Sequence, residues 1–303
     1  MQNRPWLAIL LGLFCVIVLF KLVQDTYQNR SNSVLHFMPT LSLTNDRSAE
    51  PNKTLTVARE VQGGSEISEP PFLYDQKTLQ WIKSNIVPPT FDKPYNLVNQ
   101  NKKDYSQYGQ SSKIIPDVFK YKRNGRFVEV GAADGESLSN TLSLEKYYNW
   151  TGLLIEAMPS RFQTLKSKNR RSWLLHACLS NQPTLAQTRI EFKALSVDQG
   201  RFQSINCVSL SAIFTALNWH HIDYFALDVD GLEAQILQSI PWHRVTIDVF
   251  QIECGLQCGQ NGADAQTVEM RHFLHSYMLA RGYDEIMTLA NLDLVYKRRD
   301  AKL

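Results

Sequence analysis

The sequence predicts a doubly wound α/β fold with a mostly parallel sheet and an antiparallel pair of strands at its C-terminal end. Two observations lead to this prediction. Short apolar runs, mostly continuous rather than alternating, suit strands that are buried on both faces of a parallel sheet. Segments with helical spacing separate several of these runs, as crossover helices do. The apolar runs cover residues 126–132, 151–157, 172–180, 222–230 and 246–254.

The N-terminal segment, residues 6–23, predicts a membrane anchor. Residues 6–20 carry no charge, and the run they begin is just long enough to cross a thin bilayer as a helix, at about 1.5 Å per residue. A cleaved signal peptide is the alternative, but the run is long for one and no small-residue cleavage site follows it. The short flank of residues 1–5 favours a cytosolic N-terminus and a lumenal body. We therefore expect a single-pass type II protein of the endoplasmic reticulum, Golgi or endosomal membrane.

Residues 24–71 are predicted to form a lumenal stem. They are rich in Ser, Thr, Asn, Glu and Pro and show no hydrophobic period, which is typical of a disordered linker. Glycosylation sequons begin at Asn29 and Asn52, and a third, at Asn149, abuts a predicted strand. The formal net charge is only +3, and no basic patch is interleaved with aromatic residues, so nucleic-acid binding is not expected.

The folded domain is predicted to cover residues 72–303. It opens with a helix within residues 73–87, which Pro88 and Pro89 stop. The remaining predicted elements are crossover helices over 160–171 and 232–242, a helix over 267–282, and two closing strands joined around Asn291 and Leu292.

A glycine turn follows the first predicted strand, and carboxylates flank it. Gly131 and Gly135 let the backbone approach a ligand, and a helix beginning beyond Gly135 would offer free amides to a carboxylate. The turn lacks the Gly-x-Gly of a dinucleotide fingerprint, so a nicotinamide cofactor is disfavoured. The sulfonium and amine of S-adenosylmethionine would favour acidic neighbours such as Glu129 and Asp134. Glu156 ends the next strand, where a carboxylate can accept both ribose hydroxyls.

Five segments together resemble the FkbM-type methyltransferase domain, and within it the membrane-anchored, Star-like animal branch. They are FVEVGAADGESLSNTL, GLLIEAMPSRFQTLKSKN, CVSLSAIF, HIDYFALDVDGLEAQIL and VFQIEC, and the similarity extends over roughly residues 72–299. The resemblance implies the fold of class I S-adenosylmethionine-dependent methyltransferases. It assigns Glu129, Gly131, Asp134 and Gly135 to the first cofactor motif and Glu156 to the ribose contact. The family's Asp-Val-Glu-Gly-x-Glu signature corresponds to LDVDGLE, where Asp230 replaces the usual glutamate.

The LDVDGLE block places Asp228, Asp230 and Glu233 at a strand end, a turn and a helix start. These carboxylates are the candidate catalytic residues, since they could orient a substrate hydroxyl or act as a general base. The alternative is structural: Asp228 or Asp230 would cap the following helix, and Glu233 would complement its dipole. Glu253, which ends a later strand, is a further candidate at the same edge of the sheet.

Four cysteines lie beyond the predicted anchor, and an even number suits two disulfides in an oxidising lumen. We expect Cys178 to pair with Cys207 and Cys254 with Cys258, because strand ends or a short loop could bring these sulfurs together. A zinc site of Cys254 and Cys258 with the histidines at 272 and 275 is the alternative. It is disfavoured because the two histidines are too closely spaced for a zinc finger.

Two functions from different classes fit this sequence. The first is a lumenal S-adenosylmethionine-dependent methyltransferase that transfers a methyl group, expected to be O-methyl transfer, to an unidentified glycan, lipid or small molecule. The second is implied by the Star-like resemblance: a non-catalytic factor for trafficking transmembrane growth-factor precursors from the endoplasmic reticulum to the Golgi. The cofactor residues favour the first, whereas the anchor, the stem and the altered Asp230 favour the second. Fold alone cannot separate them.

Overall fold

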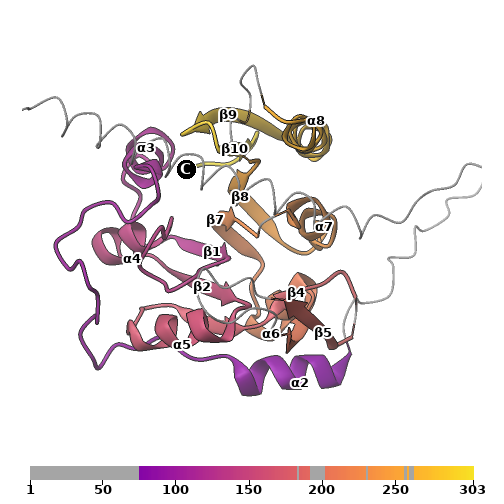
Figure 1. Cartoon of the computed structure of the whole chain (residues 1–303). Coiled ribbons are helices and arrows are strands. Elements are labelled where there is room, and N and C mark those ends of the chain that lie inside the picture. Colours follow the sequence, from indigo (N-terminus) through magenta and orange to yellow (C-terminus); the bar gives the residue numbers. More distant parts are fainter. Residues whose placement is uncertain (1–74, 183, 192–201, 230, 256–257, 259–262) are drawn as a thin grey trace, which may run out of the picture. The chain divides into compact units, whose positions relative to one another are not determined.

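The computed structural model describes residues 75–303, apart from 183, 192–201, 230, 256–257 and 259–262 (Figure 1). The predicted cytosolic tail, anchor and stem, with Asn29 and Asn52, lie outside these residues, as does Asp230. Within the described ranges, no helix is both long enough and apolar enough to cross a membrane.

The central sheet has seven strands in the order β3-β2-β1-β7-β8-β10-β9. Five are parallel: β1 (Arg126–Val130), β2 (Thr151–Glu156), β3 (Trp173–His176), β7 (His221–Leu227) and β8 (Thr246–Glu253). The closing hairpin consists of β9 (Tyr283–Leu289) and β10 (Asp293–Arg298), and β10 runs antiparallel to both β8 and β9. The predicted doubly wound sheet with an antiparallel C-terminal hairpin is therefore confirmed. Its strand order reverses between β1 and β7, which is where ligands bind in open α/β sheets.

Helices cover both faces of this sheet (Figure 1). One hydrophobic cluster joins the strands to α3 (Gln110–Asp117), α4 (Leu142–Tyr148) and α5 (Pro159–Ser167). A second cluster joins them to α2 (Gln76–Asn85), α6 (Leu210–Leu217), α7 (Glu233–Gln238) and α8 (Ala265–Ala280). Successive residues of β1 contribute to different clusters, Phe127 to the first and Val128 to the second, because side chains alternate between the faces of a strand. The four helices expected from the sequence are α2, α5, α7 and α8.

A small second sheet departs from the sequence prediction. It contains β4 (Cys178–Leu179), β5 (Ala186–Glu191) and β6 (Phe202–Val208), in the order β4-β6-β5. The apolar run 172–180 was expected to form one strand, but the structure divides it: β3 pairs with β2 in the central sheet, and β4 pairs with β6. Continuous hydrophobicity predicts burial and does not show which partner a strand will take.

Both predicted disulfides are present. Cys178 and Cys207 are directly paired residues of β4 and β6, with their Cα atoms 4.4 Å apart. Cys254 and Cys258 close a short loop after β8, with a Cα–Cα distance of 5.7 Å. The two bonds use all four cysteines beyond the predicted anchor, so the second pair is not available to zinc as thiolates.

Candidate functional site

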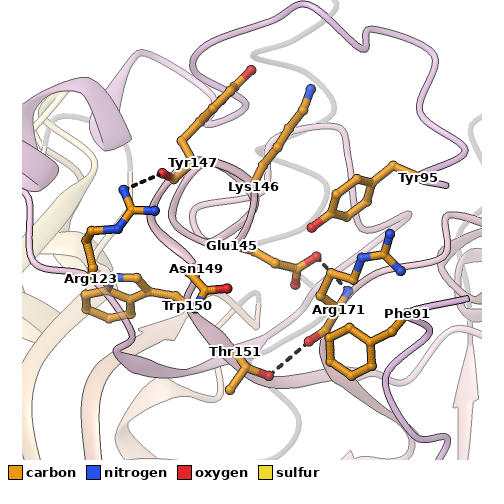
Figure 2. Close-up of a pocket in the computed structure, with 10 residues that line it drawn as sticks. All are labelled: Phe91, Tyr95, Arg123, Glu145, Lys146, Tyr147, Asn149, Trp150, Thr151 and Arg171. Atoms are coloured by element: carbon orange, nitrogen blue, oxygen red, sulfur yellow. Dashed lines mark hydrogen bonds between the residues drawn. The ribbon is translucent and has the colours of Figure 1, made fainter. Parts of the chain in front are cut away.

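A cavity lies at the edge of the sheet where the parallel strands begin. Its volume is about 560 Å³, and it is lined by Asn149 and Thr151 at the start of β2, together with aromatic and basic side chains (Figure 2). None of the residues predicted to bind the cofactor lines it. Ligands of open α/β sheets bind at the opposite edge, where the parallel strands end, so a cofactor site is expected there.

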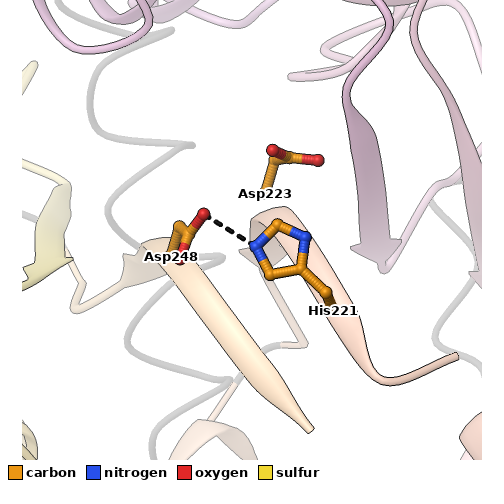
Figure 3. Close-up of side chains that lie close together, drawn as sticks. All are labelled: His221, Asp223 and Asp248. Atoms are coloured by element: carbon orange, nitrogen blue, oxygen red, sulfur yellow. Dashed lines mark hydrogen bonds and ion pairs between the residues drawn. The ribbon is translucent and has the colours of Figure 1, made fainter. Parts of the chain in front are cut away.

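A carboxylate cluster also lies on the starting side of the strands. Ligand atoms of His221, Asp223 and Asp248 all lie within 4.8 Å of one another (Figure 3). Both carboxylates already have cationic partners: Asp248 pairs with Arg298 at 3.0 Å, and Asp223 pairs with Lys122 at 2.7 Å. Asp248 also lies 2.8 Å from a ring nitrogen of His221. The protein itself neutralises this cluster, so a metal ion is not needed to balance its charge.

At the edge where the parallel strands end, called the ending edge below, the loop after β1 packs closely against the end of β7. The edge where these strands begin is called the starting edge. The amide of Gly131 donates to the carbonyl of Ile155 at 3.0 Å, and the amide of Asp228 donates to the carbonyl of Val130 at 3.2 Å. Gly131 has φ +84°, and a Cβ atom there would lie 1.9 Å from the carbonyl oxygen of Asp228. The close approach that requires this glycine is therefore between two backbone segments.

The second half of the turn differs from the prediction of a helix beginning beyond Gly135. Helix α4 begins only at Leu142. Asp134 accepts hydrogen bonds from the amides of Glu136 and Ser137, at 2.8 Å and 2.7 Å. The amides expected to be free for a ligand are thus satisfied by a local side chain, which favours a turn over a helix at this point. Asp134 therefore closes the turn.

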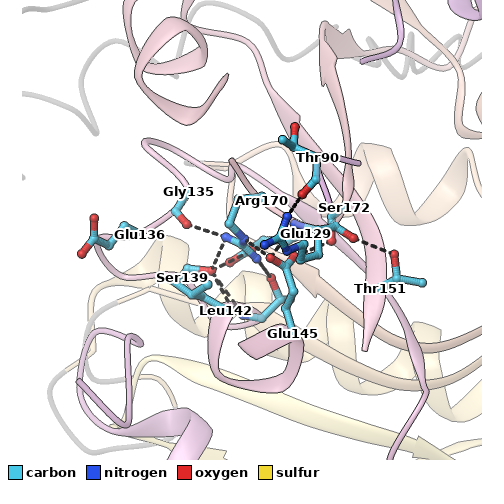
Figure 4. Close-up of polar contacts among 12 residues, drawn as sticks. Thr90, Glu129, Gly135, Glu136, Ser139, Leu142, Glu145, Thr151, Arg170 and Ser172 are labelled. Carbon is cyan, nitrogen blue, oxygen red and sulfur yellow. Dashed lines mark hydrogen bonds and ion pairs between the residues drawn. The ribbon is translucent and has the colours of Figure 1, made fainter. Parts of the chain in front are cut away.

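Glu129, near the end of β1, binds the continuation of the same loop (Figure 4). Its buried carboxylate accepts from the amide of Asn140 at 2.7 Å, from the hydroxyl of Ser139 at 3.0 Å, and from the hydroxyl of Thr141. Burial raises the pKa of Glu129, while the charge of Arg170 and these hydrogen bonds oppose the rise. The predicted cofactor carboxylate thus shapes the loop that would hold the cofactor.

Arg170 is a buried cation behind this loop and was not identified from the sequence. Its guanidinium donates to Glu145 at 2.9 Å, to the hydroxyl of Thr141 at 3.2 Å and to the carbonyl of Gly135 (Figure 4). Its structural role cannot be recognised from the sequence, because a basic residue near a helix end is usually solvated. Its long reach from the segment before β3 links α4 to the glycine turn.

Glu156 lies at the end of β2, as predicted, and is the candidate ribose ligand. One carboxylate oxygen accepts from the amide of Ala133 at 2.7 Å, and the other accepts from the amide of Met158 at 2.7 Å. Burial raises the pKa of Glu156 against these hydrogen bonds. A carboxylate offers about four lone-pair positions, so acceptor capacity remains for a ligand diol. Glu156 meets the glycine turn directly through Ala133.

Carboxyl groups from three adjacent strands lie along the same edge. Leu227 pairs with Ile252, so Asp228 and Glu253 follow at neighbouring strand ends, and Glu253 pairs with Asp293 at the start of β10. Asp228 is exposed. Asp293 was not predicted; the signal that could have found it is an aspartate directly before the apolar run 294–296, beside the predicted turn.

The candidate catalytic residue Glu233 is buried at the start of α7. It accepts from the amides of Val229 and Gly231, at 3.0 Å and 3.2 Å. Burial, with a smaller contribution from the charge of Asp228, raises the pKa of Glu233 to about 7. The structural alternative for Glu233 was that it complements the helix dipole; here its carboxylate, in the first turn of α7, also accepts from the amides of the turn that leads into the helix.

Asp293 is the second buried carboxyl at this edge. Burial and the charge of Asp228 raise the pKa of Asp293 to about 6, although the side-chain amides of Gln110 and Gln251 donate to it at 2.9 Å and 2.6 Å. Within the described part of the chain, neither Asp293 nor Glu233 forms an ion pair with a lysine or arginine. Ionisation of these two buried carboxyl groups is therefore not stabilised by a lysine or arginine among the described residues.

Comparisons with known proteins agree with this geometry. Residues 129–285, just over half of the chain, match the family described as the Methyltransferase FkbM domain. A comparison with curated proteins gave no match. Among solved structures, a methyltransferase FkbM from Methylobacillus flagellatus is similar, with 16% identity and a TM-score of 0.37 over 57% of this chain and 43% of that chain.

Two further structures are similar to the chain. Fibrillarin from Aeropyrum pernix, in complex with S-adenosyl-L-methionine, shows 10% identity and a TM-score of 0.39, covering 62% of this chain and 72% of that one. The SAH-bound methyltransferase PaMTH1 from Podospora anserina shows 12% identity and a TM-score of 0.40, covering 76% and 89%. The observed α/β sheet agrees with the class I fold that the resemblance implied. Because the family match runs from Glu129 in β1 to Glu285 in β9, through both the glycine turn and the carboxylate edge, the chain belongs to the FkbM methyltransferase-domain family.

Proposed function

We propose that this domain binds S-adenosylmethionine at the ending edge of the parallel strands and transfers the methyl group to a hydroxyl or carboxyl group of a glycan, lipid or small molecule. The observation that carries the proposal is the negative charge of that edge. Glu233 and Asp293 are buried without a described lysine or arginine partner, and burial, with a further contribution from the charge of exposed Asp228, raises the pKa of both. A ligand with a sulfonium and an ammonium group would offset the cost of this charge.

The residues of the edge fit this cofactor in two ways. Glu156 has acceptor capacity left for the ribose hydroxyls after binding the amides of Ala133 and Met158. Asp228 is exposed at the end of β7, where it would attract the positive groups. Glu129 and Asp134 act indirectly, because their carboxylates are bound within the loop they shape.

When bound, the cofactor supplies an electrophilic methyl group on sulfur. The chain's own task is then to orient the acceptor and to remove its proton. Asp228 is the exposed carboxylate that would accept a hydrogen bond from the acceptor hydroxyl and take its proton. Glu233 keeps the loop after β7 in place through Val229 and Gly231. Asp230, which was also predicted to be catalytic, lies outside the residues that the structure describes.

The direct test is calorimetric binding of S-adenosylmethionine to the purified protein. Glu156→Ala should weaken binding at least about tenfold, because charge-assisted hydrogen bonds to the ribose contribute roughly 1.5–3 kcal/mol. Asp284→Ala is the matched control. Asp284 is an exposed carboxylate of β9 that pairs with Arg299. Wild-type protein that binds no S-adenosylmethionine would refute the proposal.

We also propose that the domain lies in the lumen of the secretory pathway, anchored as a type II membrane protein of the endoplasmic reticulum, Golgi or endosomes. The disulfides Cys178–Cys207 and Cys254–Cys258 support an oxidising compartment. In sealed microsomes, protease should leave the domain intact until detergent is added. Digestion without detergent would exclude a lumenal domain.

Trafficking of growth-factor precursors remains a prediction of the sequence resemblance. The same variant separates it from catalysis. Full cargo export by Glu156→Ala, together with wild-type protein that binds no cofactor, would favour the trafficking function and leave the fold as a binding scaffold.

A further inference from the structure

The turn between α4 and β2 holds a glycosylation sequon made of Asn149, Trp150 and Thr151. As predicted, the sequon abuts a strand, because β2 begins at Thr151, but Asn149 itself is the exposed residue that caps the end of α4. The side-chain amide of Asn149 donates to the side-chain oxygen of Asn124 at 2.6 Å. That amide has two hydrogens, so one of them is not needed for this contact.

The fold contains a second turn of the same kind, which separates conformation from sequon. Asn218 ends α6 with φ 55°, and Asn149 ends α4 with φ 58°. Each is followed by a buried tryptophan, Trp219 or Trp150, and then by a strand. The left-handed backbone explains asparagine at both positions, but the tripeptide that begins at Asn218 has His220 as its third residue, where a sequon needs serine or threonine. Of these two turns, only the one at Asn149 contains a sequon.

The cavity at the starting edge of the strands is lined by the side chain of Asn149 (Figure 2). Its volume, about 560 Å³, falls within the range of roughly 300–1,000 Å³ that holds small-molecule ligands. Phe91 is an aromatic side chain with 71% of its surface exposed, and Tyr95 lies on the same side of the cavity. Arg171 lies 4.8 Å from the ring centre of Tyr95. A sugar ring suits such a cavity, because one of its faces is apolar and its hydroxyls can accept from a guanidinium.

We propose that Asn149 is N-glycosylated and that the first N-acetylglucosamine residue lies in this cavity, against Phe91 and Tyr95. The proposal rests on the lumenal location proposed above. The co-reactant is a lipid-linked oligosaccharide pyrophosphate. A bond forms between Nδ2 of Asn149 and C1 of the sugar, the bond from C1 to the pyrophosphate oxygen breaks, and the lipid pyrophosphate leaves while Nδ2 loses one proton. The second proton still donates to Asn124.

The first experiment is glycopeptide mass spectrometry on the full chain expressed in animal cells. We expect a glycan on Asn149 in the wild type and in Thr151→Ser, which keeps the sequon, and its loss in Thr151→Val and Asn149→Gln. An unmodified Asn149 in protein that carries glycans on Asn29 or Asn52 overturns the proposal and leaves the lumenal location standing. If all three sequons are unmodified, the proposal and the lumenal location fail together. Binding of S-adenosylmethionine is measured separately and is independent of either outcome.

The second experiment tests where the sugar lies. His220→Thr turns the site at Asn218 into a sequon with the same helix end and following tryptophan, and so provides an exposed reference. We expect an amidase acting on the folded protein to release the glycan of Asn149 more slowly than that of Asn218. Phe91→Ala should remove the difference. Equal release rates in the His220→Thr protein would overturn the placement in the cavity.

Discussion

The two ends of the strands β7, β8 and β10 differ in how their buried carboxyl groups are partnered. Where the parallel strands begin, buried Asp223 is paired with Lys122 and buried Asp248 with Arg298. Where they end, Asp293 and Glu233 are buried with amide partners, and their pKa values are raised to about 6 and about 7. A buried charge is costly unless it is paired. At the starting edge the protein's own side chains thus neutralise these carboxylates, whereas at the ending edge a positively charged ligand would offset the cost of ionising them.

The largest expected effect concerns the glycines of the two edges. Gly131, at the ending edge, and Gly282, before β9 at the starting edge, have nearly the same φ, +84° and +83°. A Cβ atom at Gly282 would meet nothing within 4 Å, but at Gly131 it would lie 1.9 Å from the carbonyl oxygen of Asp228. Gly282→Ala should cost about 1–2 kcal/mol from the left-handed backbone alone. Gly131→Ala should cost more than about 4 kcal/mol.

Chemical denaturation of the two variants at one temperature measures this difference directly. Because the backbone angles match, the comparison isolates the close approach between the β1 and β7 loops. Equal losses of unfolding free energy would show that the two loops separate easily, which would contradict the close contact between Gly131 and the carbonyl group of Asp228. Gly131→Val should be more severe than Gly131→Ala, since a β-branched side chain adds bulk to the same contact.

The next effect is a gain in stability from removing a charge at the ending edge. The pKa of Asp293 is raised from 3.8 to about 6, so its favourable contribution is complete below the unfolded pKa and is lost as the pH rises through about 6. At pH 8 the ionised group costs about 3 kcal/mol, at 1.36 kcal/mol per pKa unit. Asp293→Asn should therefore stabilise the ligand-free protein by about that amount at pH 8 and by little at pH 4.

The control for this prediction is the paired carboxylate of the other edge. Asp248→Asn removes the ion pair to Arg298 and should destabilise the protein by about 1–3 kcal/mol at pH 8. Thermal and denaturant unfolding of both variants across this pH range checks the opposite signs. If Asp293→Asn also destabilises the protein at pH 8, then the ionised carboxylate of Asp293 does not lower the stability of the ligand-free protein.

The sequence predicted the elements that place the site better than it predicted the site itself. Glu156 was placed correctly because a strand end can be recognised from where an apolar run stops. Asp293 was missed because its partner Gln110 is 183 residues away in the sequence. Glu129 was expected near the cofactor, but its burial and its hydrogen bonds to the loop 139–141 depend on how that loop folds back. Local patterns give strands and turns, whereas burial and long-range pairing arise only in the folded chain.

The third effect is the pH dependence of cofactor discrimination. S-adenosylhomocysteine lacks the sulfonium charge, so the ratio of its dissociation constant to that of S-adenosylmethionine reports the field at the ending edge. Raising the pH from about 5 to about 8 ionises Asp293 and Glu233 and should raise this ratio about tenfold, or about 1.4 kcal/mol. Calorimetric titrations at each pH measure it. Asp293→Asn should flatten the dependence, and a ratio that stays constant in the wild type would contradict the electrostatic role of this edge.

The smallest effect comes from making the starting edge resemble the ending one. Lys122 is partly exposed, with 28% of its side chain accessible, and pairs with the mostly buried carboxylate of Asp223. Lys122→Met should cost about 1 kcal/mol, because a partly screened ion pair is lost. The same variant should also bind a divalent cation more tightly than the wild type does. Ligand atoms of Asp223, Asp248 and His221 lie within 4.8 Å of one another, and without the lysine a divalent cation becomes the available counter-charge. Added Zn²⁺ should therefore raise the midpoint of thermal unfolding of Lys122→Met more than that of the wild type or of Lys113→Met, which removes an exposed lysine from α3. A variant that loses no stability and gains no response to the metal would show that cation pairing does not distinguish the two edges.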